Sequence, residues 1–208
     1  MNSIYIAFLA PNNKMGRFIR FFTRNPYSHV AVSLNASLET MYSFARKVKR
    51  IPFAGGFVTE YPSQYLFGNQ PIPLKLAKVN ISDKAFTRLI SVICDFKARK
   101  EDLIYNSIDA VSASLLRRSV HIRDCYTCIS FCSYLLGLRN IFSISDLEKK
   151  LQSDIVFVGD YKNYVKVSDS YDSSYFDPVG PVKVVKVTFH HFGRLFRRLI
   201  SKKKQLTP

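Results

Sequence analysis

The sequence has few acidic side chains for its 208 residues. Asp and Glu number 15 against 31 Lys and Arg, which gives a formal net charge of +16. A field of this sign favours anionic partners such as nucleic acid, acidic lipid or acidic polymers, but it does not choose among them. Since 47% of the residues are hydrophobic and 22% are charged, we expect one ordinary folded domain with an appendage rather than a disordered chain.

Long hydrophobic runs are missing too. No window reaches the roughly 20 apolar residues needed to span a bilayer. The opening "MNSIYIAFLAP" lacks a basic segment and its apolar run is short, so it predicts a strand rather than a secretory signal. Cysteine is scarce, and three of the four cysteines share one predicted helix, which is poor spacing for a secreted disulfide framework. We therefore expect a cytoplasmic protein, with the membrane surface as one place where it could act.

Hydrophobic periodicity and turn residues predict an α+β fold. Apolar residues at helical spacing follow Ser82, and this stripe includes Cys94, which we expect to be buried. The strands expected are 3–11, 27–35, 36–45, 154–161 and 180–189, with the second and third forming a hairpin. The helices expected are 14–25, 82–101, 107–116, one capped by Asp124 or Thr127 and ended by Gly137, one capped by Ser145 with Glu148 three residues later, and a basic segment from residue 190.

The stretch "DCYTCISFCSYLLG" raises the question of metal binding. Cys125, Cys128 and Cys132 have the spacing C-x2-C-x3-C, and His121 precedes them by four residues. A structural zinc site usually joins two short ligand clusters from separate turns, and this sequence has no second cluster. Iron–sulfur spacings differ as well. We therefore predict no metal and no cofactor.

Among these cysteines, Cys128 differs by its position. Cys132 lies deep in an apolar run and is interpreted as a core residue, and Cys125 as incidental. Cys128 falls in the first turn of the predicted helix, where free backbone N–H groups and the helix dipole favour a thiolate and can hold an oxyanion. A thiol nucleophile also needs a base, which would be a neutral histidine from elsewhere in the fold.

The four histidines do not identify that base by themselves. His190 and His191 lie in the basic tail and His121 in a charged linker, so solvent exposure is the simpler interpretation for all three. His29 lies in the predicted strand "YSHVAVSL". A single histidine in a strand is more often structural than catalytic, and spacing alone does not favour catalysis.

Several short motifs, taken in order, resemble a known family. The segments "YSHVAV", "MYSFARK", "GGFVTE" and "YTCISF" are similar to motifs of the circularly permuted NlpC-type papain-like cysteine hydrolases, and most of all to their YiiX-like and YycO-like bacterial members. In that branch the histidine strand precedes the cysteine helix. The resemblance runs from residue 3 to about residue 162 and implies a permuted papain-like fold, with a small antiparallel sheet packed on helices.

The resemblance implies that Cys128 is the nucleophile and His29 the general base. The polar residue that orients the histidine is expected on the following strand, where Ser43 is the first candidate and Glu39 the second. Glu60 matches a position typical of the closer relatives, although a structural ion pair is the alternative. Tyr27 and Tyr126 are expected beside the site. Relatives often carry Ser-Gln-Phe after the cysteine, whereas this chain has Ile129-Ser130-Phe131 and lacks the glutamine.

The function that follows is a thiol-dependent hydrolase or acyltransferase acting on an amide or ester bond of a peptide, an isopeptide or an acyl lipid. Two other classes stay open: a papain-like binding module without catalysis, and a basic protein that binds nucleic acid or a membrane surface. No recognised nucleic-acid-binding motif supports the last alternative. The domain organisation expected is a catalytic domain at 1–165, an acidic loop and late strand at 166–189, and a basic tail at 190–208.

The basic tail is amphipathic. Leu195, Phe196, Leu199 and Ile200 are expected on one side, which suits a helix on an anionic membrane, with packing on the domain as the alternative. The surface cations expected there are Arg194, Arg197, Arg198, Lys202, Lys203 and Lys204.

Overall fold

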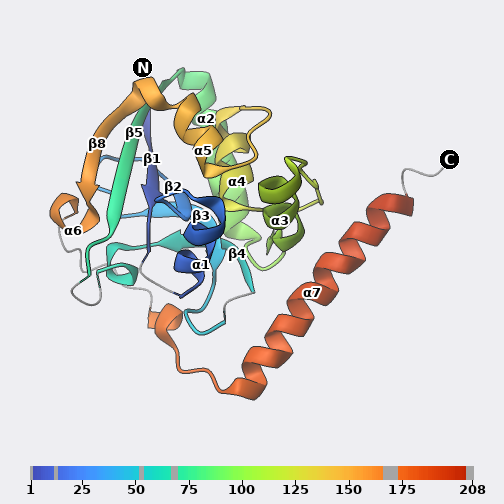
Figure 1. Ribbon diagram of the computed structural model, residues 1–208. Helices are drawn as coiled ribbons and strands as arrows, with labels where there is room; N and C mark the ends of the chain where they lie inside the picture. Colours follow the sequence, from blue (N-terminus) through green and yellow to red (C-terminus); the bar gives the residue numbers. More distant parts are fainter. Residues whose placement is uncertain (1, 12–13, 52–53, 67–69, 166–172, 205–208) are drawn as a thin grey trace.

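A six-stranded antiparallel sheet, with helices around it, organises the protein in the computed structural model (Figure 1). The structure describes residues 2–11, 14–51, 54–66, 70–165 and 173–204. The strand order is β4-β3-β2-β1-β5-β8, and each neighbouring pair is antiparallel. The strands are β1 Asn2–Leu9, β2 His29–Ser33, β3 Met41–Arg46, β4 Gly55–Glu60, β5 Pro73–Ile81 and β8 Ile155–Asp160.

A second, parallel pair consists of β6 (Ile104–Tyr105) and β7 (Cys125–Tyr126). The helices are α1 Lys14–Thr23, α2 Asp83–Ala98, α3 Ser107–Leu116, α4 Cys128–Leu136, α5 Ile144–Lys150, α6 Tyr161–Tyr164 and α7 Pro181–Lys204. The mixed α+β class, the hairpin of β2 and β3, and most element positions are as the sequence predicts.

The larger core lies between the sheet and the helices α2, α4 and α5. Alternate residues of the strands supply one side of it, as the period of a strand requires. The rings of Phe44 and Phe57 contact those of Phe96 from α2 and Phe131 from α4. This packing fixes α4 against the strands β2 and β3, which brings the start of the helix to the sheet.

A smaller core covers the other side chains of the same strands. It contains Leu9, Met41 and Leu74, together with Tyr65 and Tyr161. Tyr65 follows a single 3-10 turn at Pro62–Gln64, directly after β4. The turn therefore directs the Tyr65 ring back toward the end of that strand, where it packs on Tyr161.

Three local predictions about elements and cysteines are wrong, and so is the solvent exposure expected for His191, which is only 6% exposed. Ser143, not Ser145, caps α5, because its side chain accepts the N–H of Asp146, while Ser145 Oγ accepts from the side chain of Asn25. Cys94 is exposed rather than buried, since α2 turns Leu89, Ile93 and Phe96 to the core.

The third error concerns residues 180–189, of which 181–189 belong to α7 instead of a strand. Their valines recur at spacings that fit both the two-residue period of a strand and the 3.6-residue period of a helix, and Pro181 is well suited to the first turn of a helix. As a helix, the segment turns Val184 and Val187 toward Ile51 and Val179. Residues 166–172 of the expected acidic loop, and the side chains of Phe18 and Phe22, lie outside the described residues.

Within the described part of the chain, none of the helices combines the length and the apolar character needed to cross a membrane.

Candidate active site

Cys128 is the first residue of α4, at the point where the helix meets the sheet. Thr127 caps the helix: its side chain accepts the N–H of Ser130, and the Ser130 hydroxyl accepts the N–H of Thr127. This reciprocal pair uses two N–H groups of the helix start. The N–H groups of Cys128 and Ile129 have no partner within the helix, because the first turn lacks preceding carbonyls. Of the two caps expected from the sequence, Thr127 is the one that caps the helix.

His29 is the first residue of β2 and is mostly buried, with 12% of its side chain exposed. Its Nε2 lies 2.8 Å from Oε1 of Glu60. Cys128 lies near His29 and contributes to the shift of the imidazole pKa. Since an imidazole has two ring nitrogens and Nε2 faces the carboxylate, Nδ1 is the nitrogen left for the thiol. The imidazole thus lies between a cysteine and a carboxylate that are distant in the sequence.

Glu60 ends β4 and is almost completely buried, with 2% of the residue exposed. Its Oε1 accepts hydrogen bonds from His29 and from the Ser43 hydroxyl, and its Oε2 accepts one from the Tyr65 hydroxyl. A buried carboxylate needs such partners because burial alone costs several kcal/mol. The three donors hold both oxygens in place, so the carboxylate is fixed toward His29.

The residue that contacts the imidazole therefore differs from the expected one. Ser43 does come from the predicted strand and is fully buried, but its hydroxyl donates to Glu60. Glu39 is exposed in the turn between β2 and β3 and is not part of the cluster. The partner of the imidazole is Glu60, one strand further along, for which the sequence left a structural ion pair as the alternative. Alternation placed Ser43 on the correct face but could not show how far a glutamate reaches across the sheet.

The pKa of His29 is strongly shifted. Burial alone would lower it, but the charge of Glu60 and the hydrogen bonds with Cys128 and Glu60 outweigh burial and raise the pKa to about 10. Burial alone would raise the pKa of Glu60, but the positive charge of His29 and the three hydrogen bonds that Glu60 accepts lower it. The arrangement therefore favours a protonated imidazole beside an ionised carboxylate at neutral pH.

Two tyrosines near these groups were not singled out by the sequence. Tyr65 has no motif to mark it, and only its place after β4 brings it to Glu60. Tyr105 lies in β6, where burial and the proximity of Cys128 and Asp109 raise its pKa. A hydroxyl that stays neutral there can donate a hydrogen bond near the thiol. No sequence signal identified Tyr105, because its neighbourhood depends on the pairing of β6 with β7.

The tyrosines that were expected beside the site lie close to it in sequence. Tyr27 is buried two residues before His29 and packs against Phe8. Tyr126 precedes the cap of α4, and its ring contacts Phe44 and Phe96. Both therefore support the two elements that carry the cysteine and the histidine.

Cys125 and Cys132, the other cysteines of this stretch, have different surroundings. Cys132 is completely buried in the main core, where burial raises its pKa. Cys125 lies in β7; its thiol donates to the carbonyl of Arg123, and it also contacts the guanidinium of Arg198 at 3.7 Å. Across the described residues, no three His, Cys, Asp or Glu side chains gather as they would to hold a metal ion.

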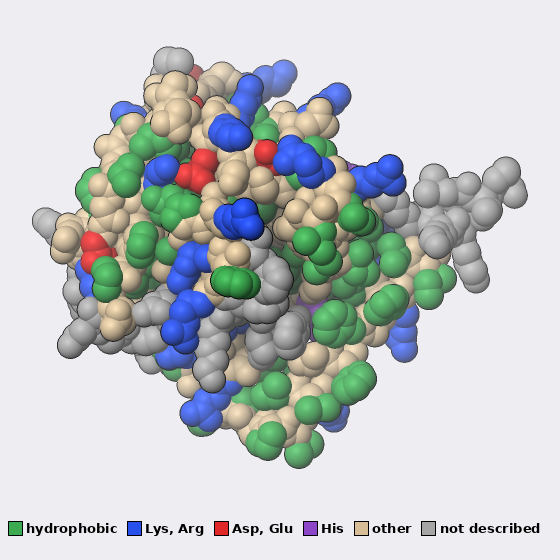
Figure 2. All heavy atoms as spheres, viewed as in Figure 1, with side chains coloured by type: hydrophobic (Ala, Val, Ile, Leu, Met, Phe, Trp, Pro, Cys, Tyr) green, Lys and Arg blue, Asp and Glu red, His purple; other side chains and the backbone are tan. Residues whose placement is uncertain are grey.

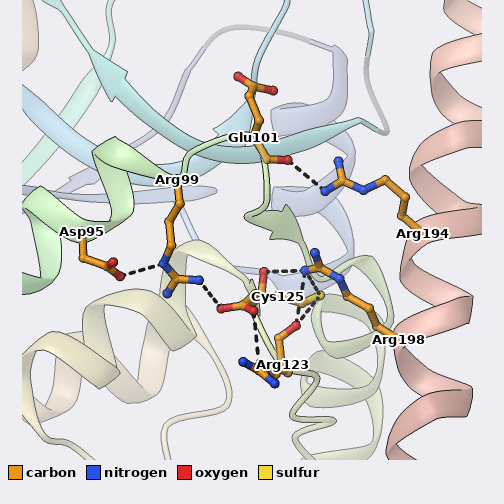
Figure 3. Close-up of polar contacts among 8 residues, drawn as sticks. Asp95, Arg99, Glu101, Arg123, Cys125, Arg194 and Arg198 are labelled. Carbon is orange, nitrogen blue, oxygen red and sulfur yellow. Dashed lines mark hydrogen bonds and ion pairs between the residues drawn. The ribbon is translucent and has the colours of Figure 1, made fainter.

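The basic tail is part of α7, which lies along the domain (Figures 1 and 3). Arg194 donates to the carbonyl of Glu101, and Arg198 to those of Arg123 and Asp124. Arg197 is exposed, and the side chains of Lys202, Lys203 and Lys204 lie outside the described ones. The apolar side expected for this tail is divided in two, because Leu195 and Leu199 pack on the domain whereas Phe196 and Ile200 are exposed.

Searches with this chain found no matching family model, no similar curated protein and no similar solved structure.

Proposed function

We propose that the protein is a thiol-dependent hydrolase or acyltransferase in which Cys128 is the nucleophile, His29 the acid and base, and Glu60 the residue that orients the imidazole. The observation that carries this proposal is the position of the His29 ring between Glu60 and Cys128. A nucleophile, a base and an orienting group in this order are the parts required for acyl transfer.

The first half of the reaction forms a thioester. The Cys128 sulfur attacks the carbonyl carbon of an amide or ester, and the electrons of the C=O bond move to its oxygen. The N–H groups at the start of α4 would donate to that oxyanion, and the helix dipole favours the negative charge. The protonated imidazole of His29 then gives its proton to the leaving amine or alcohol as the bond to it breaks.

The second half releases the acyl group. Water, or a second nucleophile in the case of transfer, approaches the thioester carbon and gives its proton to His29. The carbon–sulfur bond breaks, the acid or the transferred product leaves, and the Cys128 thiolate faces the imidazolium again. Glu60 stays ionised throughout, since Ser43 and Tyr65 continue to donate to it.

The topology supports a permuted papain-like arrangement. The strand that carries His29 precedes the helix that carries Cys128 by 99 positions (128 − 29), and α4 packs on an antiparallel sheet. This is the order of elements that the resemblance to the permuted NlpC-type hydrolases implies. The peptide, isopeptide and acyl-lipid classes of substrate stay open under this proposal.

The test uses an activated ester, for example p-nitrophenyl acetate, with the full chain. We expect a burst of nitrophenolate equal to the enzyme concentration, followed by slow turnover, with the mass of one acetyl group on the peptide that contains Cys128. Cys128→Ala should remove the burst, and His29→Ala should slow both the burst and the turnover that follows it. Cys94→Ala is the matched control and should behave as the wild type. Acetylation distributed equally over Cys94 and Cys128 would contradict the proposal.

A further inference from the structure

The helix α7 carries two separate apolar faces. The inner face holds it on the domain: Leu195 is fully buried in a cluster with Ile104, Ile122 and Cys125, and Leu199 packs on the same cluster. Near the start of the helix, Val184 and Val187 pack in a second cluster. These contacts account for the packing of α7 and use none of its outer side chains.

The outer face is a continuous hydrophobic stripe. At 3.6 residues per turn its members fall within an arc of roughly 60°, whose centre lies roughly 110° around the helix from Leu195. Each of them is more than half exposed, and Figure 2 shows hydrophobic side chains gathered on the part of the surface that α7 and α3 occupy. The stripe consists of Val182, Val185, Phe189, Phe196 and Ile200.

The neighbouring helix α3 enlarges the hydrophobic surface. It lies next to α7 in Figure 1, and its Ile108 packs in the same cluster as Leu195. On its solvent side Val111, Leu115 and Leu116 are each at least 60% exposed. Scattered single hydrophobic residues need no explanation, but a gathered set of this kind marks an interaction surface.

The charges beside the stripe are all of one sign. Lys183, Lys186 and Arg197 are exposed on one flank of α7, together with His190. No acidic residue follows Asp177 in the sequence. A hydrophobic stripe bordered by cations is the pattern of a helix that lies in the interface of an anionic bilayer.

The same pattern disfavours two other occupants. A second copy of the chain would bring two basic helices together without compensating carboxylates, and the protein already carries +16. A nucleic acid would satisfy the cations but would leave Phe189 and Phe196 without a matching apolar surface.

We infer that the outer face of α7 docks the protein on an anionic membrane surface, with the hydrophobic stripe in the acyl–headgroup boundary and the basic flank on acidic lipid headgroups. The helix lies in the plane of the interface, since it is about 36 Å long but carries cations along its whole length. This inference is independent of the proposed chemistry, because none of its residues belongs to the candidate active site.

The first experiment uses the absence of tryptophan from the natural sequence. Phe189→Trp, made in the full chain, places a single fluorophore in the stripe. Its emission should shift to the blue with vesicles of phosphatidylcholine and phosphatidylglycerol, and brominated acyl chains should quench it. Vesicles of phosphatidylcholine alone should produce a much smaller change. Val158→Trp, at an exposed position of β8, is the control and should not respond.

The second experiment measures binding to the same vesicles by co-sedimentation. Phe189→Ser with Phe196→Ser should weaken binding by about tenfold or more, whereas Val156→Ser with Val158→Ser, which removes exposed apolar groups from β8, should not. Neutralising the flank with Lys183→Gln, Lys186→Gln and Arg197→Gln should weaken binding by about tenfold or more. The matched charge control, Lys84→Gln, Lys149→Gln and Lys150→Gln, should have a smaller effect.

Three results would overturn the inference. One is equal binding to neutral and anionic vesicles, or no binding to either. Another is unchanged binding by the Phe189→Ser, Phe196→Ser variant. The third is a wild-type dimer in light scattering that this variant converts to a monomer without any lipid binding, which would assign the stripe to a second copy of the chain.

Discussion

At the scale of single residues, the candidate site depends on one buried carboxylate. Glu60 joins His29 to two hydroxyl donors, Ser43 and Tyr65, and so couples three strands and the turn after β4. Cys128 and His29 could be chosen from the sequence because a family resemblance supplied their order. The role of Glu60 could not, because it depends on side-chain reach across the sheet rather than on the spacing of the motifs.

Replacing Glu60 tests its role as a positioning residue. We expect Glu60→Gln to lower the rate of thioester formation by about ten- to a hundredfold, since the amide can hydrogen-bond to the imidazole but no longer stabilises its positive charge. The pH optimum should move to lower pH with the pKa of His29. Ser43→Ala, which removes one donor to the same carboxylate, should have a smaller effect. Burst amplitude and pH profile measure both, and an unchanged pH profile for Glu60→Gln would rule out the role.

The pKa of His29 also predicts a dependence of stability on pH. The value is about 10 in the folded protein and 6.5 for the free side chain, so the folded state holds the extra proton between these values. The stabilisation is complete below about pH 6.5 and is lost as the pH rises through about 10. Urea unfolding from pH 6 to 10 should show the wild type losing stability faster than His29→Gln. Parallel curves for the two proteins would show that His29 is not protonated in the fold.

At the scale of elements, local signals set most of the structure. Ser82 caps α2, and Gly137 ends α4 in a left-handed conformation with φ 67°, as these residues predict. Where the prediction from the sequence was wrong, two local signals competed. Ser143 and Ser145 are both suitable caps, and only tertiary contacts of Ser145 with Asn25 separate them. Residues 181–189 fit a strand and a helix alike, and packing against Ile51 decides.

The cap of α4 gives a prediction at this scale. Thr127→Ala removes the acceptor of the Ser130 N–H and should lower the free energy of unfolding by about 1 kcal/mol. Because Cys128 is the next residue, the same change should also slow its acylation. Ser82→Ala, which removes the exposed cap of α2, should lower stability by a similar amount without affecting acylation. Equal acylation rates in the two variants would show that the cap of α4 does not affect the reactivity of Cys128.

At the scale of the whole molecule, α7 is an addition to the sheet domain that covers the region of β6 and β7. Its contacts reach the backbone of Tyr105, which is near His191, and Cys125, which Arg198 contacts. Both lie close in the chain or in space to the cysteine helix. The sequence predicted a basic amphipathic segment here, but its two faces can be assigned only from the packing of Leu195 on the domain.

Adjacent residues on α7 separate its two faces experimentally. Leu195→Ala should lower the free energy of unfolding by about 2–5 kcal/mol or release the helix, because it opens a cavity at a fully buried position. Phe196→Ala, one residue further and more than half exposed, should leave stability within about 0.5 kcal/mol of the wild type. Hydrogen exchange along α7 should increase only for the first variant. Similar losses for both would show that the outer face is also packed.

The account as a whole rests on the meeting of Cys128 with His29. The most direct measurement is the rate of alkylation by iodoacetamide at pH 6, followed for each cysteine by mass spectrometry of its peptide. We predict that Cys128, although buried, reacts at least about tenfold faster than the exposed Cys94, because the proposed mechanism pairs its sulfur with His29 at the start of α4. His29→Ala should abolish this advantage. A wild-type Cys128 that reacts no faster than Cys94, with or without His29, would contradict the assignment.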